Sequence, residues 1–265
     1  MLRTRRTLRT AMRVLPISVL VVASVAMAPA SAKAPLPAHW CSVNGEEAPP
    51  GKRVTGTPGS DTILCEGDVQ NVILWGGGGA DKIRVKGLVI DASVLGGEGD
   101  DTIQVNNLYP RNADSMVRGG GGDDTIITAL VVGTAEHGAT VHGDHGDDEI
   151  TTGAVQGQPG TYQRGGGQVF GNDGSDTIRT SAVDLGGRIV GGSENDIIEP
   201  KSLGVESSGT VQGGPGNDMI RGQREEVLTI GPGWAVVDGG LGTDRCRVRH
   251  AGEGERIRSS IASCP

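Results

Sequence analysis

The sequence predicts an all-β protein: a parallel β-solenoid of about nine rungs with a disulfide-stapled cap at each end. Three observations lead to this fold class. Glycine is unusually frequent, large aromatic side chains are nearly absent, and one eight-residue motif recurs along the chain. The 265 residues include 46 Gly but only 3 Trp, 2 Tyr and 1 Phe. Conventional sandwiches and doubly wound enzymes fill their cores partly with rings, so this composition argues against them.

The first 32 residues predict a secretory signal peptide. Five arginines between residues 3 and 13 precede an apolar run from Val14 to Ala28, and Ala30-Ser31-Ala32 offers a small-residue cleavage site. No later segment approaches 18 consecutive apolar residues, so we expect a secreted, extracellular protein with no membrane span after cleavage. Removing the five arginines changes the net charge from −8 to −13, which argues against nucleic acid as a partner.

The repeated motif defines the body of the chain, residues 54–247. Glycine occupies its first position in all nine copies and its fourth in eight, while isoleucine occupies the eighth in eight. An aliphatic residue lies two positions before each copy, and the copies recur every 20 to 28 residues. The sixth position is always aspartate: Asp61, Asp81, Asp101, Asp124, Asp148, Asp176, Asp196, Asp218 and Asp244.

Each copy reads as a strand, a tight glycine corner and a second strand. One such unit cannot bury its apolar side chains alone, so the units are expected to stack, with each isoleucine about 4.8 Å above its equivalent in the previous rung. Longer rungs carry surplus residues, such as Tyr109 to Asn112 and Gln156 to Arg164. We expect these to bulge out on the side away from the glycine corner.

The corner itself predicts a cation site. Glycines at the first, second and fourth positions allow positive φ, so the backbone can turn sharply and point carbonyl oxygens to one side. The aspartate adds a carboxylate, and stacked corners would form an all-oxygen cage of the kind that Ca²⁺ prefers. Eight Ca²⁺ between nine corners would change −13 to about +3. Without the ions the aspartates would repel one another, which links metal binding to folding.

Tandem GGxGxDxI motifs resemble the hemolysin-type, repeats-in-toxin calcium-binding family, over about Val54 to Arg247. The resemblance implies a parallel β-roll whose turns bind Ca²⁺ through the aspartate and backbone carbonyls, and which folds when it meets calcium outside the cell. The family's unit is nine residues with calcium turns on both sides. One motif per longer rung suggests a single ion column here.

Four copies depart from the glycine pattern. Thr57, Asp144 and Asn172 replace the second glycine, and Glu194 replaces the fourth. We expect the sites that touch the rung of Asp196 to be weaker or to use Glu194 as a ligand.

Four cysteines behind a signal peptide predict disulfides, with three possible pairings. Cys41 and Cys65 lie at the start of the repeats, and Cys246 and Cys264 lie at their end. Local pairing would staple a cap over each open end of the solenoid, for which residues 33–53 and 248–265 are the candidates. A redox pair is disfavoured because the chain has no Cys-x-x-Cys.

Catalytic motifs are missing from the sequence: it has no Gly-x-Ser-x-Gly, no His-Glu-x-x-His and no P-loop. His137, His142 and His145 form the only histidine cluster, and two of them occupy corner positions that face water, which disfavours zinc. Trp40, Trp75 and Trp234 could stack on sugars, but their scattered positions favour packing at caps or edges.

The sequence therefore predicts a secreted, non-enzymatic calcium-binding β-roll that acts as an extracellular structural or adhesion module. Besides calcium, its partner would be an extracellular glycan or protein. The competing hypothesis is a carbohydrate-active solenoid with structural calcium, similar to a polysaccharide lyase or epimerase. In that case Asp91, Asp114 or Asp184 would perform acid/base chemistry on an acidic glycan. Activity on polyuronates would separate the two hypotheses.

Overall fold

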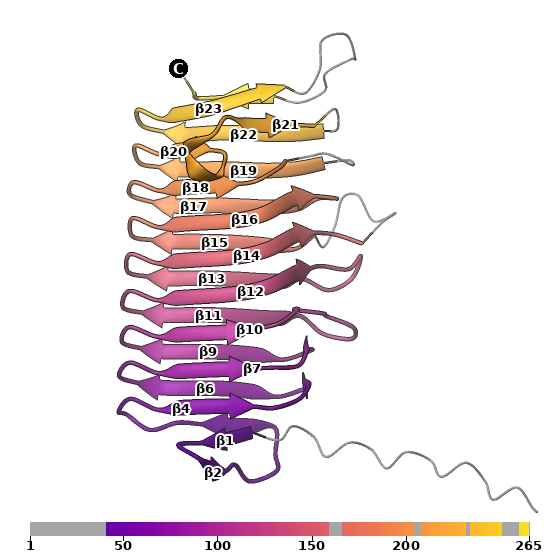
Figure 1. Ribbon diagram of the computed structural model, residues 1–265, viewed down its shortest axis with the longest axis vertical. Coiled ribbons are helices and arrows are strands. Elements are labelled where there is room, and N and C mark those ends of the chain that lie inside the picture. The colour runs from indigo at the N-terminus through magenta and orange to yellow at the C-terminus, as the bar shows by residue number, and fades with distance from the viewer. Residues whose placement is uncertain (1–40, 159–165, 204–207, 232–233, 251–259, 265) are drawn as a thin grey trace, which may run out of the picture. The chain divides into compact units, whose positions relative to one another are not determined.

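The computed structural model describes residues 41–158, 166–203, 208–231, 234–250 and 260–264. The predicted signal peptide and residues 33–40 of the predicted N-terminal cap lie outside the described residues, as does most of the surplus segment 156–164. The described residues belong to one compact unit and form a parallel β-solenoid of about eight turns (Figure 1). This confirms the predicted fold class.

Two long sheets face each other across the solenoid. Neighbours in the 12-stranded sheet follow the order β2 (Glu46–Glu47), β1 (Cys41–Val43), β4 (Thr62–Cys65), β7 (Lys82–Val85), β10 (Thr102–Val105), β12 (Thr125–Val132), β14 (Glu149–Gln156), β16 (Thr177–Asp184), β18 (Ile197–Pro200), β20 (Met219–Arg221), β23 (Arg245–His250) and β21 (Leu228–Ile230).

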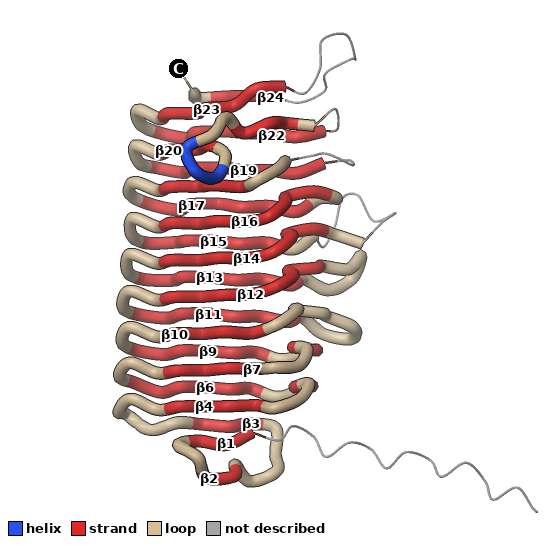
Figure 2. The backbone as a smooth tube through the Cα atoms, viewed as in Figure 1, coloured by secondary structure: helices blue, strands red, loops and turns tan. Residues whose placement is uncertain are grey.

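The 10-stranded sheet runs in the order β24 (Ser260–Ala262), β22 (Trp234–Leu241), β19 (Ser208–Pro215), β17 (Gly187–Ser193), β15 (Gln168–Asp173), β13 (Ala139–His145), β11 (Ser115–Gly121), β9 (Ser93–Glu98), β6 (Ile73–Gly78) and β3 (Arg53–Thr55). A third, two-stranded sheet pairs β5 (Val69–Gln70) with β8 (Val89–Ile90). A short 3-10 segment, η1 (Gln223–Glu225), is the only helix in the described ranges (Figure 2). Among those residues no helix is long and apolar enough to cross a membrane.

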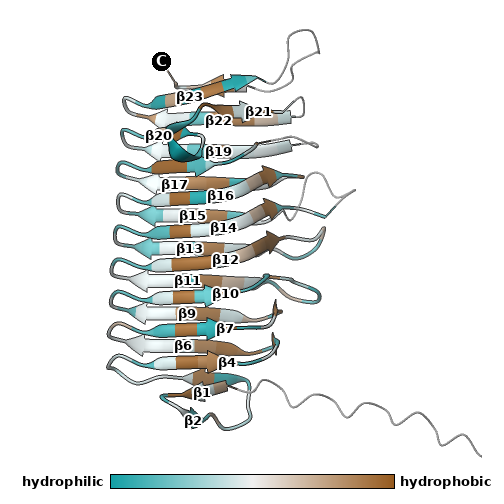
Figure 3. Cartoon of the chain, in the orientation of Figure 1, coloured by the Kyte–Doolittle hydropathy of each residue, from teal (hydrophilic) through white to brown (hydrophobic). Residues whose placement is uncertain are grey.

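The register places equivalent motif positions directly beside one another, as predicted. The eighth-position isoleucines pair in sequence from Ile63 to Ile220, and the column ends at Cys246. On the facing sheet the aliphatics two residues before each corner form a second column, from Val54 to Val237. The isoleucine column and most of the aliphatic column are fully buried, and brown bands of hydrophobic residues run up the solenoid (Figure 3). Small aliphatics fill a core too thin for rings.

The glycine corners stack on one side of the solenoid, and the longer loops project from the other (Figure 2). Leu108 bridges to Val89 below and Val131 above, so the rung that contains Tyr109 to Asn112 keeps its place in the stack while its surplus residues loop outward. This matches the expected position of the bulges. Because the corners hold equivalent residues one above another, they position any site that the motif forms.

The ends of the solenoid are finished differently. At the N-terminal end, β1 and β2 form an antiparallel hairpin that covers the edge of β4, and Cys41 lies opposite Cys65 in the register. At the C-terminal end, β24 adds to β22 in parallel. The structure contains the disulfides Cys41–Cys65 and Cys246–Cys264, which are the local pairings that the sequence favoured.

Candidate metal centre

Each glycine corner turns through residues with left-handed backbone angles. The second and fourth positions of the copy at Gly76 have φ of 119° at Gly77 and 87° at Gly79, and the other regular copies behave alike. L-amino acids with a Cβ rarely adopt these angles, so glycine is required there for the reason that the sequence suggested.

The non-glycine corner residues mostly keep the same backbone. Asp144 and Asn172, at the second position, both have φ of 85°, and Glu194, at the fourth, has φ of 76°. Asp and Asn tolerate this region better than other side chains, because their short polar groups bond locally. Glu194 is exposed at its corner, where its charge acts on the buried Asp196 beside it.

The first glycine of the motif is required for a different reason from the one we expected. None of the nine first-position glycines has a positive φ. Instead, a Cβ added at any of them would lie closer than 3.0 Å to Oδ2 of the aspartate in its own corner. At eight of the nine it would also meet a backbone carbonyl oxygen of the next rung, such as that of Gly96 above Gly76. The glycine therefore allows a carboxylate and a carbonyl oxygen to approach the same Cα.

The sixth-position aspartates form a buried column with a repeated hydrogen bond. The backbone N–H of each aspartate donates to Oδ1 of the aspartate in the next rung, as Asp101 does to Asp124 at 2.7 Å and Asp176 does to Asp196 at 2.9 Å. Eight such bonds join all nine residues from Asp61 to Asp244. Each side chain is 1–3% exposed. The carboxylates from Asp81 to Asp244 thus bind across rungs 20 to 28 residues apart rather than capping their own turns.

The other carboxylate oxygen of the column has no partner in the described part of the chain. Oδ2 is buried without a hydrogen bond in eight residues: Asp81, Asp101, Asp124, Asp148, Asp176, Asp196, Asp218 and Asp244. Folded proteins rarely leave buried polar atoms unpaired, because each one loses its bonds to water without replacement. Eight such atoms in one line indicate a missing partner, either a proton or a cation.

Burial makes the column hard to ionise in the absence of metal. Desolvation is the main cause that raises these pKa values, and the charges of neighbouring acidic residues add to it, while the N–H bond to Oδ1 opposes it. The pKa rises above its ordinary range in Asp81 and Asp218, and it reaches about 6 in Asp101, about 7 in Asp148 and Asp196, and about 8 in Asp124 and Asp176. A bound cation would favour the ionised form at these positions.

Asp61, at the N-terminal end of the column, is satisfied by protein groups instead. Its Oδ2 accepts hydrogen bonds from the backbone N–H of Thr57 at 2.5 Å and from the Thr57 hydroxyl at 2.8 Å. Its Oδ1 accepts one from Nδ2 of Asn44 at 2.5 Å. The Thr57 N–H is the main cause that lowers the pKa of Asp61. Asp61 is therefore the weakest of the nine predicted ligands.

Asn44 was not among the residues singled out from the sequence. It stands where a preceding rung would lie, since its Nδ2 donates to Asp61 and its Oδ1 accepts from the N–H of Thr62 at 2.8 Å. The signal was present as Asn44-Gly45, a dipeptide typical of two-residue hairpin turns, and both residues have positive φ. The hairpin β1–β2 thus ends the aspartate column as well as covering the sheet.

The donor set fits a hard cation that takes oxygen ligands. Among the described residues no three His, Cys, Asp or Glu side chains converge into a metal-binding group. Any ion at the corners would therefore need backbone carbonyls in addition to the carboxylates, as the motif predicted. Unpaired Oδ2 atoms and the carbonyl oxygens beside them supply both kinds of ligand, and this combination favours Ca²⁺ over transition metals.

The residues considered for acid/base chemistry do not form a shared site. Asp91 is held by its surroundings: burial alone would raise its pKa, but backbone N–H donors from Arg111, Asn112 and Ala113 lower it below the ordinary value. Asp114 accepts the N–H of Gly138 at 2.7 Å. Asp184 accepts the N–H of the next residue at 2.8 Å.

The three clustered histidines also contact different partners and do not share one site. Nδ1 of His145 lies 2.9 Å from Oδ2 of Asp173. His142 stacks on Phe170, with ring centroids 4.8 Å apart. Nδ1 of His137 lies 3.9 Å from Oδ1 of Asp114.

Comparison with known proteins supports the interpretation of the corners. A scan against protein families matches the RTX calcium-binding nonapeptide repeat in four copies, at residues 55–85, 113–129 and 203–224, about a quarter of the chain. Searches of curated proteins and of solved structures returned no significant match. Three segments of the chain thus match the RTX calcium-binding nonapeptide repeat, the family that the motif resembled in sequence.

Proposed function

We propose that this protein is a secreted calcium-binding β-roll without enzymatic activity, in which Ca²⁺ along the aspartate column holds the rungs together. It would serve as an extracellular structural or adhesion module. Column aspartates from Asp81 to Asp244 are the proposed ligands, with Asp61 contributing least. The observation that carries the proposal is the line of eight buried, unpaired Oδ2 atoms.

Calcium would act on folding through charge. A buried column of carboxylates either stays protonated or repels itself, and both states cost free energy at neutral pH. An ion held by Oδ2 and a carbonyl oxygen of the next rung would join two rungs at once. Binding at one corner would then favour order at the next, so folding and binding are expected to be cooperative along the column.

Far-UV circular dichroism of residues 33–265 during a Ca²⁺ titration tests the proposal. The oxidised protein starts in chelator, and Mg²⁺ serves as the control cation. A cooperative gain of β structure with Ca²⁺ is the expected result, because Mg²⁺ demands a stricter octahedral geometry and gives up its water reluctantly. A protein that is already fully folded and equally stable in chelator would overturn the role of calcium.

Adjacent residues provide a matched pair of variants for the same titration. Asp124 belongs to the buried column, whereas Asp123 is exposed at the same corner and accepts the N–H of Asp147 at 2.9 Å. Asp124→Asn should shift the calcium midpoint to higher concentration. Asp123→Asn keeps its acceptor oxygen, removes only an exposed charge that acts on Asp148, and should shift the midpoint much less. An equal shift in both variants would assign the effect to net charge alone.

A further inference from the structure

A groove crosses the outer face of the 10-stranded sheet beside the glycine corners. The residue just before each first glycine points outward, and the register places Trp75 of β6 beside Leu95 of β9, and Leu95 beside Arg118 of β11. Next to them, the second corner position is glycine at Gly77, Gly97 and Gly120 and the third is glycine at Gly78 and Gly121, so backbone covers much of this strip. The large side chains of Trp75, Leu95 and Arg118 therefore lie beside a strip of sheet surface that has few side chains of its own.

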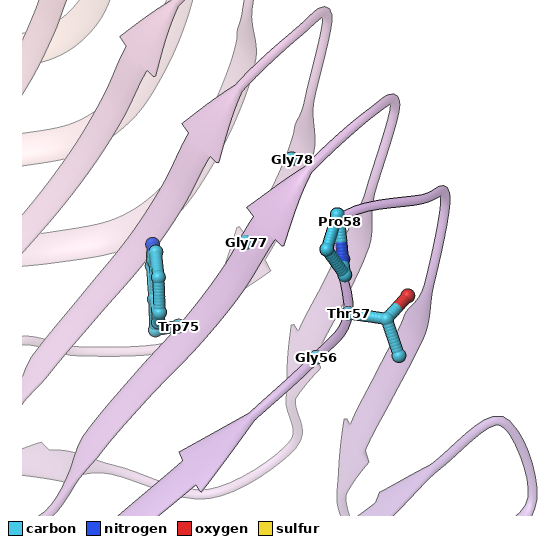
Figure 4. A pocket seen from close by; sticks show the side chains of 6 residues that line it. All are labelled: Gly56, Thr57, Pro58, Trp75, Gly77 and Gly78. Atoms are coloured by element: carbon cyan, nitrogen blue, oxygen red, sulfur yellow. The ribbon is translucent and has the colours of Figure 1, made fainter.

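The first half of the groove is a pocket of about 300 Å³ at the N-terminal end. Figure 4 shows Trp75 on one side, Thr57 and Pro58 on the other, and Gly77 and Gly78 between them. Thr57 and Pro58 belong to the copy that departs from the glycine pattern, GTPG in place of GGxG. This departure builds the second wall of the pocket. The guanidinium of Arg53 lies 5.0 Å from the Trp75 ring centroid and supports the ring.

The second half is a pocket of about 690 Å³ on the other side of Trp75. Its lining includes Trp75 and Leu95 as apolar groups, Glu98, and the pair formed by Arg118 and Asp144. Arg118 binds Asp144 through two hydrogen bonds, Nε to Oδ2 at 2.7 Å and Nη2 to Oδ1 at 2.6 Å. Glu98 is exposed, and its carboxylate has no hydrogen bond or ion pair within the described ranges. Both pockets fall in the size range of small-molecule sites.

The composition of the groove selects the chemistry of its ligand. Arg118 and Asp144 neutralise each other, so the groove has little net charge apart from the carboxylate of Glu98. It combines an aromatic ring and a leucine with a free carboxylate and exposed backbone groups. A pyranose ring matches this combination, because its C–H faces pack on aromatic rings while its hydroxyl edges bond to carboxylates and backbone.

The geometry points to a binding groove for a neutral polysaccharide, with Trp75 as the central stacking residue and Glu98 as a hydroxyl acceptor. From Thr57 to Asp144 the groove crosses four rung steps, roughly 19 Å at about 4.8 Å each, which suits an extended chain of several sugar rings. The inference rests on the proposed function in that calcium stabilises the rungs that form the floor. It adds a ligand class and a location to the adhesion role.

Two kinds of variant test the groove. Trp75→Ala removes the stacking wall, and its control is Trp234→Ala, an exposed tryptophan near the C-terminal end of the same sheet. Gly121→Leu fills the floor instead. Gly121 does not have a positive φ, and a Cβ there would meet only the flexible end of Glu98 at 3.1 Å. Leucine already occupies the equivalent position at Leu241, so the roll accommodates it.

Isothermal titration calorimetry in excess Ca²⁺ would use cellohexaose, maltohexaose, mannohexaose and xylohexaose, with hexagalacturonate and hexalysine as charged probes. At least one neutral probe should bind, more tightly than either charged probe. Trp75→Ala and Gly121→Leu should each weaken that binding at least tenfold, and Trp234→Ala should not change it. Circular dichroism of each variant confirms that the calcium transition is intact.

The results separate this inference from the role of calcium. The groove is overturned if no neutral probe binds the wild type, if a charged probe binds best, or if both groove variants bind as the wild type does. A normal calcium transition without sugar binding would overturn the groove alone. Sugar binding by a protein that ignores calcium would overturn the calcium role and leave the groove standing.

Discussion

Replacing Asp124 by asparagine should change stability in opposite directions with and without calcium. In the metal-free protein the buried Asp124 has a pKa of about 8, against an ordinary value of 3.8. Keeping it protonated at pH 7 therefore costs the folded state up to about 4 kcal/mol. Asparagine has the same shape, can accept the N–H of Asp101 through its oxygen, and needs no proton. Metal-free Asp124→Asn should be more stable at pH 7 by up to that amount.

The effect should depend on pH with a defined sign. Because the folded-state pKa lies above the unfolded value, the penalty is absent below about pH 4 and grows as the pH rises toward about 8. The difference between variant and wild type in chelator should therefore vanish near pH 4. With Ca²⁺ the order reverses, because asparagine is neutral and offers one oxygen. The calcium midpoint should rise at least tenfold, or about 1.4 kcal/mol.

Urea unfolding followed by far-UV circular dichroism, in chelator and in excess Ca²⁺, measures both effects. Asp123→Asn is the control and should change both curves much less, because it removes only an exposed charge that acts on Asp148. Destabilisation of Asp124→Asn in chelator, equal to that in calcium, would refute the reasoning. It would mean that Oδ2 of Asp124 has a favourable partner in the metal-free protein.

Three further predictions concern the column, the corner and the N-terminal end. Calcium binding near pH 7 should release protons and weaken as the pH falls, because column carboxylates with pKa values of about 6 to 8 must ionise. The pH change in unbuffered solution measures the proton release. An absence of release would contradict the protonated state of the metal-free carboxylates. Gly171→Ala should cost about 2–3 kcal/mol in urea unfolding, since its Cβ would press on Oδ2 of Asp176, whereas Gly121→Ala should change stability by less than about 0.5 kcal/mol. Equal costs would disprove the close-approach explanation. Joint replacement of Cys41 and Cys65 by alanine should lower the free energy of unfolding by about 3 kcal/mol, and an unchanged thermal midpoint would show that the hairpin stays in place without the bond.

Much of the fold was predictable because the repeated motif determines which residues of neighbouring rungs pair. Glycine, aspartate and isoleucine recur at fixed offsets, so only stacking aligns Ile63 with Ile83 and each later isoleucine with the next. The scarcity of aromatic residues pointed to the same thin core. Local disulfide pairing was also favoured by spacing, since each cysteine pair lies within one rung length.

The candidate site was predictable in its residues but not in its contacts. The sequence indicated that the aspartates share one column, yet it suggested positive φ as the reason for every corner glycine. At Gly76 the reason is instead the approach of Oδ2 of Asp81 and a carbonyl of the next rung. Asn44 was missed because its partner, Asp61, lies 17 residues away, beside the strand β4 that pairs with β1.

The sequence by itself determined the repeat, its all-β character, the line of aspartates and their preference for a cation with oxygen ligands. These follow from local chemistry: glycine allows the corner, aliphatics require burial, and carboxylates with carbonyls suit Ca²⁺. Only the tertiary structure decided which oxygen of each aspartate is bonded and which is unpaired, and that Trp75 stands between two pockets. Those properties depend on atoms of different rungs, which become neighbours only when the rungs stack.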